Sequence, residues 1–213
     1  MYLTKRLLMS CCLLASLNSY AETSPGIDHT GWYVGGALGA NNSEFEVDDF
    51  SFSEDTLGQQ IYGGYNFNQW FGIEANFFLS GDVSGDEVGI RDAYFSSISI
   101  APKVTLPISS QFSFFAKIGL TQLVYTEEYS RRYYDYYYDD DWYDYDRRQS
   151  WTDQVASYTI GAEWSITNHL KLRAVYDYVS GTIEEDDYDY YDYHLDEFDA
   201  TLKTLSVGAH YQF

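Results

Sequence analysis

Six charged residues each stand between apolar or aromatic neighbours in the sequence. In a β-strand this spacing points the charged side chain to the face opposite the apolar one. Three of the six are acids and three are bases, and because an unpaired buried charge is costly we expect them to pair with one another. Such a network could gate the passage of ions, or it could be a static polar filling of a narrow interior. The six residues are Glu74, Lys103, Lys117, Glu163, Arg173 and Asp177.

The segments that hold these residues alternate apolar and polar positions with a period of two, which is typical of strands with one apolar face. The last segment shows the pattern clearly, since Leu205, Val207 and Ala209 alternate with Ser206 and Gly208. A soluble sandwich strand can show the same alternation, so one segment alone decides little. We predict eight strands, at residues 31–40, 59–67, 71–79, 94–106, 112–125, 155–166, 170–183 and 201–213.

The connections between these strands are alternately long and short. Eight antiparallel strands with this alternation are the layout of an outer-membrane barrel, with short turns in the periplasm and long loops outside. A soluble barrel such as a lipocalin would point its apolar face inward, whereas here the charges share a face with glycine, serine and asparagine. The sequence therefore predicts an all-β fold, an eight-stranded antiparallel up-and-down transmembrane β-barrel. It would span residues 31–213, with long extracellular loops at 41–57, 80–92, 126–151 and 184–200.

The first 30 residues precede the predicted barrel. Lys5 and Arg6, an apolar run at 7–17 and a small-x-small cleavage site are typical of a secretory signal peptide, which we place at residues 1–21. The apolar run is too short for a spanning helix. Residues 22–30 then form a short periplasmic leader.

The composition is strongly acidic, with a formal net charge of -21, and removal of Lys5 and Arg6 with the signal makes it about -23. Such a chain should not bind nucleic acid through phosphate neutralisation. The four predicted extracellular loops hold 27 of the 33 acids but only 5 of the 12 bases, so the negative charge gathers at the cell surface. Cys11 and Cys12 both lie in the signal, so the mature chain has no thiol chemistry and needs no disulfide.

Several stretches resemble the OmpA/OmpX-like family of eight-stranded outer-membrane barrels, and in particular the OmpA transmembrane domain without its periplasmic domain. The likeness covers essentially all the predicted strands and none of the outer loops. The peptidoglycan-binding role of that periplasmic domain is not carried over, because the sequence stops at Phe213. The similar stretches are residues 63–74, 102–107, 161–173 and the final strand.

The resemblance also implies roles for particular residues. A final strand that ends in Tyr211 and Phe213 resembles the strand that closes these barrels and is read by the barrel insertion machinery. The interior ion-pair gate of the family, a Glu/Lys/Glu/Arg set, matches Glu74, Lys103, Glu163 and Arg173 by local motif.

Residues 131–148 are rich in tyrosine and aspartate and are nearly palindromic. Folded as a hairpin, this segment would set Tyr136 opposite Tyr143 and Arg131 opposite Arg148. Tyrosine pairs stabilise cross-strand contacts, but two arginines directly opposite do not, so the register could slip. We expect the strands on either side to continue past the membrane as a projecting hairpin.

Two further sites are weakly indicated. The carboxylates of Glu184, Glu185, Asp186 and Asp187 could bind a divalent cation, but they lack the spaced ligands of an EF-hand, and a charge run is usually solvated. A lipid-modifying enzyme would need serine, histidine and an acid near the outer rim. The four histidines do not form such a set in the sequence, and we predict no enzyme, no metal and no cofactor.

We conclude from the sequence that the chain is an exported, integral outer-membrane barrel with a structural or surface-recognition role, similar to adhesion, carried by acidic, tyrosine-rich loops. The alternative is a narrow gated pore for ions or small solutes, and a lipid-modifying enzyme is the less favoured one. The expected partners are outer-membrane lipid and lipopolysaccharide, the insertion machinery, and a host or phage surface ligand.

Overall fold

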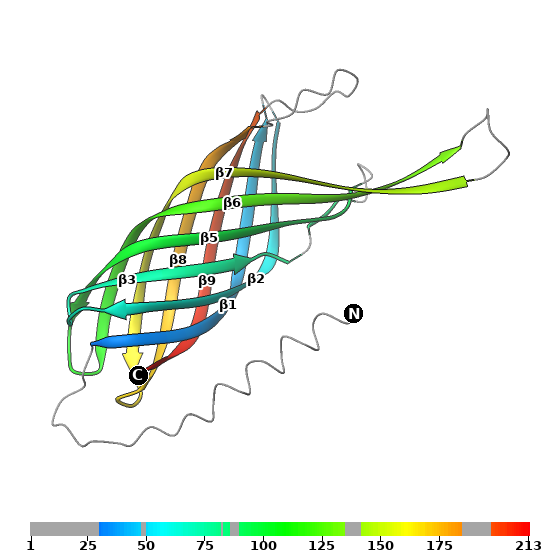
Figure 1. Ribbon diagram of the computed structural model, residues 1–213. Coiled ribbons are helices and arrows are strands. Elements are labelled where there is room, and N and C mark those ends of the chain that lie inside the picture. Colours follow the sequence, from blue (N-terminus) through cyan, green and yellow to red (C-terminus); the bar gives the residue numbers. More distant parts are fainter. Residues whose placement is uncertain (1–29, 48–49, 82, 86–89, 135–141, 185–196) are drawn as a thin grey trace.

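The computed structural model describes residues 30–213 except 48–49, 82, 86–89, 135–141 and 185–196, and its strands close into one barrel (Figure 1). Each strand pairs with its neighbours in antiparallel fashion, and pairing of β3 with β5 completes the ring. The strands are β1 (Gly31–Val47), β2 (Phe50–Asn66), β3 (Phe71–Leu79), β4 (Val83–Gly85), β5 (Ile90–Pro107), β6 (Phe112–Tyr134), β7 (Trp142–Ser165), β8 (Leu170–Glu184) and β9 (Glu197–Gln212).

The predicted eight-stranded up-and-down barrel is confirmed. The short β4 follows β3 along the same side of β5, so β3 and β4 together occupy one of eight positions in the barrel wall. Three tight turns join β2 to β3, β5 to β6 and β7 to β8 at one end, called here the turn end. The opposite end is called here the hairpin end, and β6 and β7 project beyond it (Figure 1). The structure contains no helix, among its described residues, that could cross a membrane.

Apart from β3, which has the predicted bounds, the eight predicted strands are longer than the sequence indicated. Most of the predicted loop 41–57 is strand, since β1 ends at Val47 and β2 begins at Phe50. The predicted loop 126–151 likewise contains the ends of β6 and β7, which pair up to Tyr134 and Trp142. The alternation of apolar and polar residues fades in these segments, but the backbone hydrogen bonds of the ladder do not depend on it.

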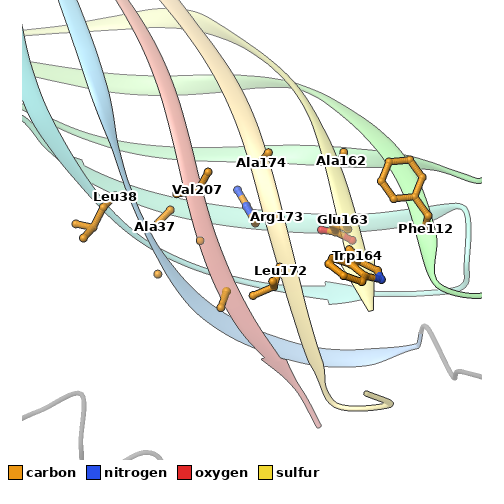
Figure 2. A pocket seen from close by; sticks show the side chains of 13 residues that line it. Ala37, Leu38, Phe112, Ala162, Glu163, Trp164, Leu172, Arg173, Ala174 and Val207 are labelled. Atoms are coloured by element: carbon orange, nitrogen blue, oxygen red, sulfur yellow. The ribbon is translucent and has the colours of Figure 1, made fainter. Parts of the chain in front are cut away.

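The barrel wall has an apolar outer face near the turn end. On β3, Phe71, Ile73 and Phe77 are exposed outside, while Glu74 and Phe78 are buried inside. Exposed leucine, isoleucine, phenylalanine and tryptophan side chains recur on the other strands, a far larger apolar surface than a soluble monomer exposes. A shallow depression on this face follows small residues such as Ala162 and Ala174 (Figure 2). We take this outer belt as the surface that lipid covers.

The polarity of the wall inverts toward the hairpin end. On β6, the lipid-facing Leu120 is 70% exposed, but Gln122, the next residue on that outer face, is polar. On the inner face the change is opposite, because the polar Lys117 and Thr121 give way to the buried Leu123. Apolar inside and polar outside is the pattern of a soluble barrel, so this part of the wall is suited to water.

Candidate functional site

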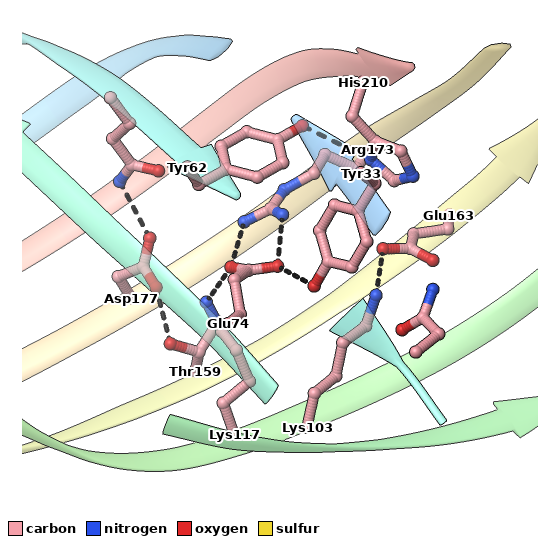
Figure 3. A network of polar contacts seen from close by, with 12 residues as sticks. Tyr33, Tyr62, Glu74, Lys103, Lys117, Thr159, Glu163, Arg173, Asp177 and His210 are labelled. Carbon is pink, nitrogen blue, oxygen red and sulfur yellow. Dashed lines mark hydrogen bonds and ion pairs between the residues drawn. The ribbon is translucent and has the colours of Figure 1, made fainter. Parts of the chain in front are cut away.

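Glu74 is the centre of an ion-pair group inside the barrel (Figure 3). Lys117 Nζ donates to its Oε1 at 2.6 Å, and Arg173 donates to both carboxylate oxygens, at 2.9 and 3.2 Å. The hydroxyl of Tyr33 adds a hydrogen bond of 2.8 Å to Oε2. A buried carboxylate is tolerated only when its acceptors are satisfied, and here four donors satisfy it.

A second ion pair lies beside this group. Lys103 Nζ donates to Glu163 Oε1 at 2.6 Å, and both residues are buried. Aromatic rings fill the space around the cations: the guanidinium carbon of Arg173 lies 3.6 Å from the centre of the Tyr62 ring, and Lys103 Nζ lies 4.8 Å from the centre of the Phe115 ring. Cations over ring faces gain electrostatic energy. We call these side chains together the ion-pair layer: Tyr33, Tyr62, Glu74, Lys103, Phe115, Lys117, Glu163 and Arg173.

The close fit of this layer depends on glycine. A Cβ on Gly161 would lie 2.5 Å from a ring carbon of Phe115, so only glycine leaves room for that ring. The layer therefore needs small residues in the wall as much as it needs charges in the interior.

Asp177 does not join the ion pairs as the sequence predicted. Its carboxylate accepts hydrogen bonds from Gln60 Nε2 at 2.9 Å and from Thr159 Oγ1 at 2.6 Å. Five of the six predicted residues thus form two neighbouring ion-paired groups, and the sixth has neutral donors. Asp177 lies closer to the hairpin end than Arg173 does. The register partner of Arg173 on β7 is Glu163, whereas the partner of Asp177 is Thr159, four residues nearer that end.

The site predicted from the sequence left out two interior residues. Lys171 is buried, and its Nζ donates to Gln212 Oε1 at 3.3 Å. His210 is also buried, between the rings of Tyr33 and Tyr62. Lys171 lies two residues before Arg173 and so on the same inner face, which the strand period alone could have shown. The predicted set of three acids and three bases therefore lacked one buried base, Lys171.

An apolar cluster closes the interior near the hairpin end. Phe95 and Leu123 are both 0% exposed there, and the Phe95 and Tyr125 rings lie 4.9 Å apart. Trp151 stacks on Tyr125 from above the cluster, with ring centres 5.5 Å apart. We call this cluster the apolar cap: Ala93, Phe95, Leu123, Tyr125, Val155, Ala200 and Leu202, with Trp151 and Val179 packed against it.

A small cavity, called here the chamber, separates the cap from the ion-pair layer. Its volume is about 30 Å³, and Glu74 and Lys117 line it on one side while Val179 and Leu202 line it on the other. Serine, threonine, glutamine and asparagine side chains make up most of its wall. In the part of the chain that the structure describes, the interior is thus filled in three layers: ion pairs, a polar chamber and an apolar cap.

A family model described as the outer membrane protein beta-barrel domain matches residues 8–213. The chain belongs to this family. Membership implies an outer-membrane location. We expect the turn end to lie in the periplasm and the hairpin end outside, because short turns are periplasmic in barrels of this kind. The predicted family resemblance is confirmed.

Solved structures of three bacterial proteins match the chain, and the first two share its fold. Neisserial surface protein A is 14% identical with a TM-score of 0.61, and the match covers 86% of this chain and 98% of that one. Ail of Yersinia pestis, solved with the heparin analogue sucrose octasulfate, is 17% identical with a TM-score of 0.50, covering 86% and 99%. OprG of Pseudomonas aeruginosa is 13% identical with a TM-score of 0.45, covering 88% and 98%. A search of curated protein sequences gave no significant match.

The terminal strand closes the barrel of this family member. β9 pairs with β1 on one side and with β8 on the other. Tyr211 stacks on His169 and contacts Phe213 edge to face, and the Phe213 amide donates to the Trp32 carbonyl at 2.9 Å.

Of the four carboxylates of the predicted cation site, only the first belongs to the described residues. Glu184 is the last residue of β8, while Glu185, Asp186 and Asp187 lie outside the described residues. Within the described ranges, no group of three or more histidine, cysteine, aspartate or glutamate residues could hold a metal ion.

The β6–β7 hairpin has a different register from the predicted one. Arg131 is paired with Tyr145 and Arg148 with Glu128, whereas the sequence reading set the two arginines opposite each other. The predicted partners of Tyr143 and Trp142, at positions 136 and 137, lie outside the described residues; the structure pairs these two with Tyr133 and Tyr134.

Proposed function

We propose that the protein is a closed outer-membrane scaffold that presents an acidic, tyrosine-rich hairpin to a partner at the cell surface. The observation that supports this proposal is the filled interior: among the described residues, the ion-pair layer and the apolar cap are separated by a chamber of about 30 Å³. A barrel with so little free space inside is suited to act through its outer surface.

The projecting part of β6 and β7 is the best candidate for the binding surface. The two strands remain paired from Phe112 and Trp164 at the turn end to Tyr134 and Trp142, far beyond the apolar cap (Figure 1). Tyrosine and aspartate dominate residues 129–146. Tyrosine supplies contact area at low entropic cost, as in antibody binding loops.

The charge of the surface favours a basic partner. Ail was solved with a sulfated, polyanionic ligand. This chain has 27 acids in the four segments predicted to face outward, against 5 bases, so a polyanion would be repelled. We infer that the ligand class is a cationic protein surface on a host cell or phage, and that binding weakens as salt screens the charges.

The test compares binding of cells that carry the full protein with binding of cells that carry a variant whose residues 129–148 are replaced by a tight Asn-Gly turn. Immobilised polylysine-rich and heparin-coated surfaces serve as the cationic and anionic probes. We expect the full protein to retain cells on the cationic surface only, and the shortened hairpin to reduce retention at least about tenfold. Equal retention with both hairpins would contradict the proposal. Heat-modifiable migration on gels checks that both barrels fold.

A narrow pore is the second candidate function. The interior is polar and charged and holds a cavity, so a small rearrangement of side chains could give a continuous path for water. An enzymatic role has less support. Of the described histidines, His210 contacts tyrosine rings inside the barrel, and His169 contacts the backbone carbonyl of Gln212 at the turn end. Neither lies at the outer rim, where a lipid-modifying site would need it.

A further inference from the structure

The chamber is bounded by two layers of opposite chemistry. Toward the periplasm, its floor is Glu74 and Lys117, which are joined by an ion pair of 2.6 Å. Toward the outside, its roof is Val179 and Leu202 on the underside of the apolar cap. Ions can be stopped by a filled layer of paired charges, and separately by an apolar constriction that water does not wet.

The walls of the chamber contain polar atoms without a protein partner. Gln60 must turn its amide nitrogen to the carboxylate of Asp177, because that carboxylate can only accept a hydrogen bond. The Gln60 carbonyl oxygen is therefore fixed in place, and it has no hydrogen-bond partner among the described residues. Asn76 Oδ1 and Thr121 Oγ1, on the same wall, also lack partners there.

Water is the ligand that suits these atoms. Buried acceptors need donors, and a volume of about 30 Å³ has room for about two water molecules. Larger solutes do not fit. The wall carries one further carboxylate, Asp177, and its hydrogen bonds from Gln60 and Thr159 leave it with capacity for more.

We propose that the barrel is closed by two independent barriers in series, the ion-pair layer and the apolar cap, and that the chamber between them holds ordered water. The cap is the barrier to the outside. Breaking the ion pairs then connects the chamber to the periplasm but does not open a path through the protein. Only the loss of both barriers makes a pore.

Two measurements on the same four proteins test this inference. The first variant, F95A/L123A, shortens two cap residues that are 0% exposed. The second variant, E74A/R173A, removes one acid and one base that contact each other and so leaves the interior net charge unchanged. The third carries all four substitutions, and the fourth protein is the unmodified barrel. Conductance is recorded in planar bilayers, and chamber access is measured in micelles with the reporter Ser99→Cys, which lies on the chamber wall.

Reporter labelling and conductance should respond differently to the loss of one barrier. Labelling of the reporter by a small cationic methanethiosulfonate should become at least about tenfold faster when either barrier is removed, since one open side is enough. Conductance should appear only in the combined variant, because current must cross both barriers. Each protein without the reporter cysteine gives the background labelling.

Other outcomes overturn the inference. Conductance in either two-residue variant would mean that one layer alone closes the barrel. A silent combined variant, or a reporter that stays protected in F95A/L123A, would mean that the cap is not the outer barrier. The matched control I98A/L120A shortens lipid-facing residues on the same two strands and should change neither readout. If F95A/L123A fails the heat-modifiability check for folding, L123A alone replaces it in both measurements.

Discussion

Glu74 stabilises the barrel because it neutralises two cations at once. Its carboxylate contacts Lys117 and Arg173, and the Glu74 and Arg173 side chains have no exposed surface. In Glu74→Gln both cations lose their charged partner, and removal of one member of a buried pair typically costs about 3–5 kcal/mol. We expect a loss of this size in the free energy of unfolding, measured by urea titration of the barrel in lipid vesicles.

Asp177→Asn is the matched comparison for Glu74→Gln. Asp177 accepts only from neutral donors, so its replacement should cost about 1 kcal/mol, the value of an ordinary hydrogen bond. Equal losses in the two variants would contradict the assignment of Glu74, and not Asp177, to the ion-pair layer.

The inner positions of these charges could be predicted from the sequence, but their partners could not. A period of two fixes which face Lys103 and Glu163 occupy, because it is a property of each strand alone. Their contact joins residues 60 positions apart, and the contact of Arg173 with Glu74 joins residues 99 apart. Such pairs depend on the stagger of the strands around the ring, which the sequence pattern does not contain.

The inversion of polarity along the strands shows where the lipid-covered surface ends on the side of the hairpin end. Leu120 on β6 and Ala156 on β7 are register partners, and the next outward pair is Gln122 with Gln154. The first pair is apolar and the second polar, so the edge lies between them. A nitroxide at position 120 should be relaxed by oxygen dissolved in lipid, and one at position 122 by a water-soluble nickel complex. Positions 156 and 154 should repeat the contrast, and lipid-like accessibility at 122 and 154 would contradict the inversion.

The sequence analysis did not predict the apolar cap because it did not allow for this inversion of polarity. The prediction took the inner face to be polar along the whole of each strand. Phe95, Leu123 and Val155 were therefore not recognised as members of a buried apolar cluster. Their signal was present, since each has polar neighbours where the strand leaves the lipid: Ser96, Gln122 and Gln154. A prediction that allows the inner and outer faces to exchange polarity within one strand would have found the cap.

At the scale of the whole molecule, stability depends on the seam where the first and last strands meet. β1 pairs with β9 from Tyr33 with Gln212 to Glu46 with Asp199. Gly39 lies on the inner face of this seam, where an added Cβ would meet the backbone of Leu205 and Ser206, so a larger residue must force the strands apart. Gly36 lies on the outer face of the same strand, and a Cβ there would meet only the Gln60 carbonyl, at 3.3 Å.

The closed seam should appear on gels as resistance to detergent. An intact barrel stays folded in sodium dodecyl sulfate until it is heated and migrates faster than its boiled form, because every strand edge is paired. We expect Gly39→Val to lose the fast form at a lower temperature than the unmodified protein, and Gly36→Val, a substitution of the same size on the lipid side, to keep it. Loss of the fast form in both variants at the same temperature would show that the barrel responds to bulk anywhere on β1, and closure at the β1–β9 seam would then not be what limits its stability.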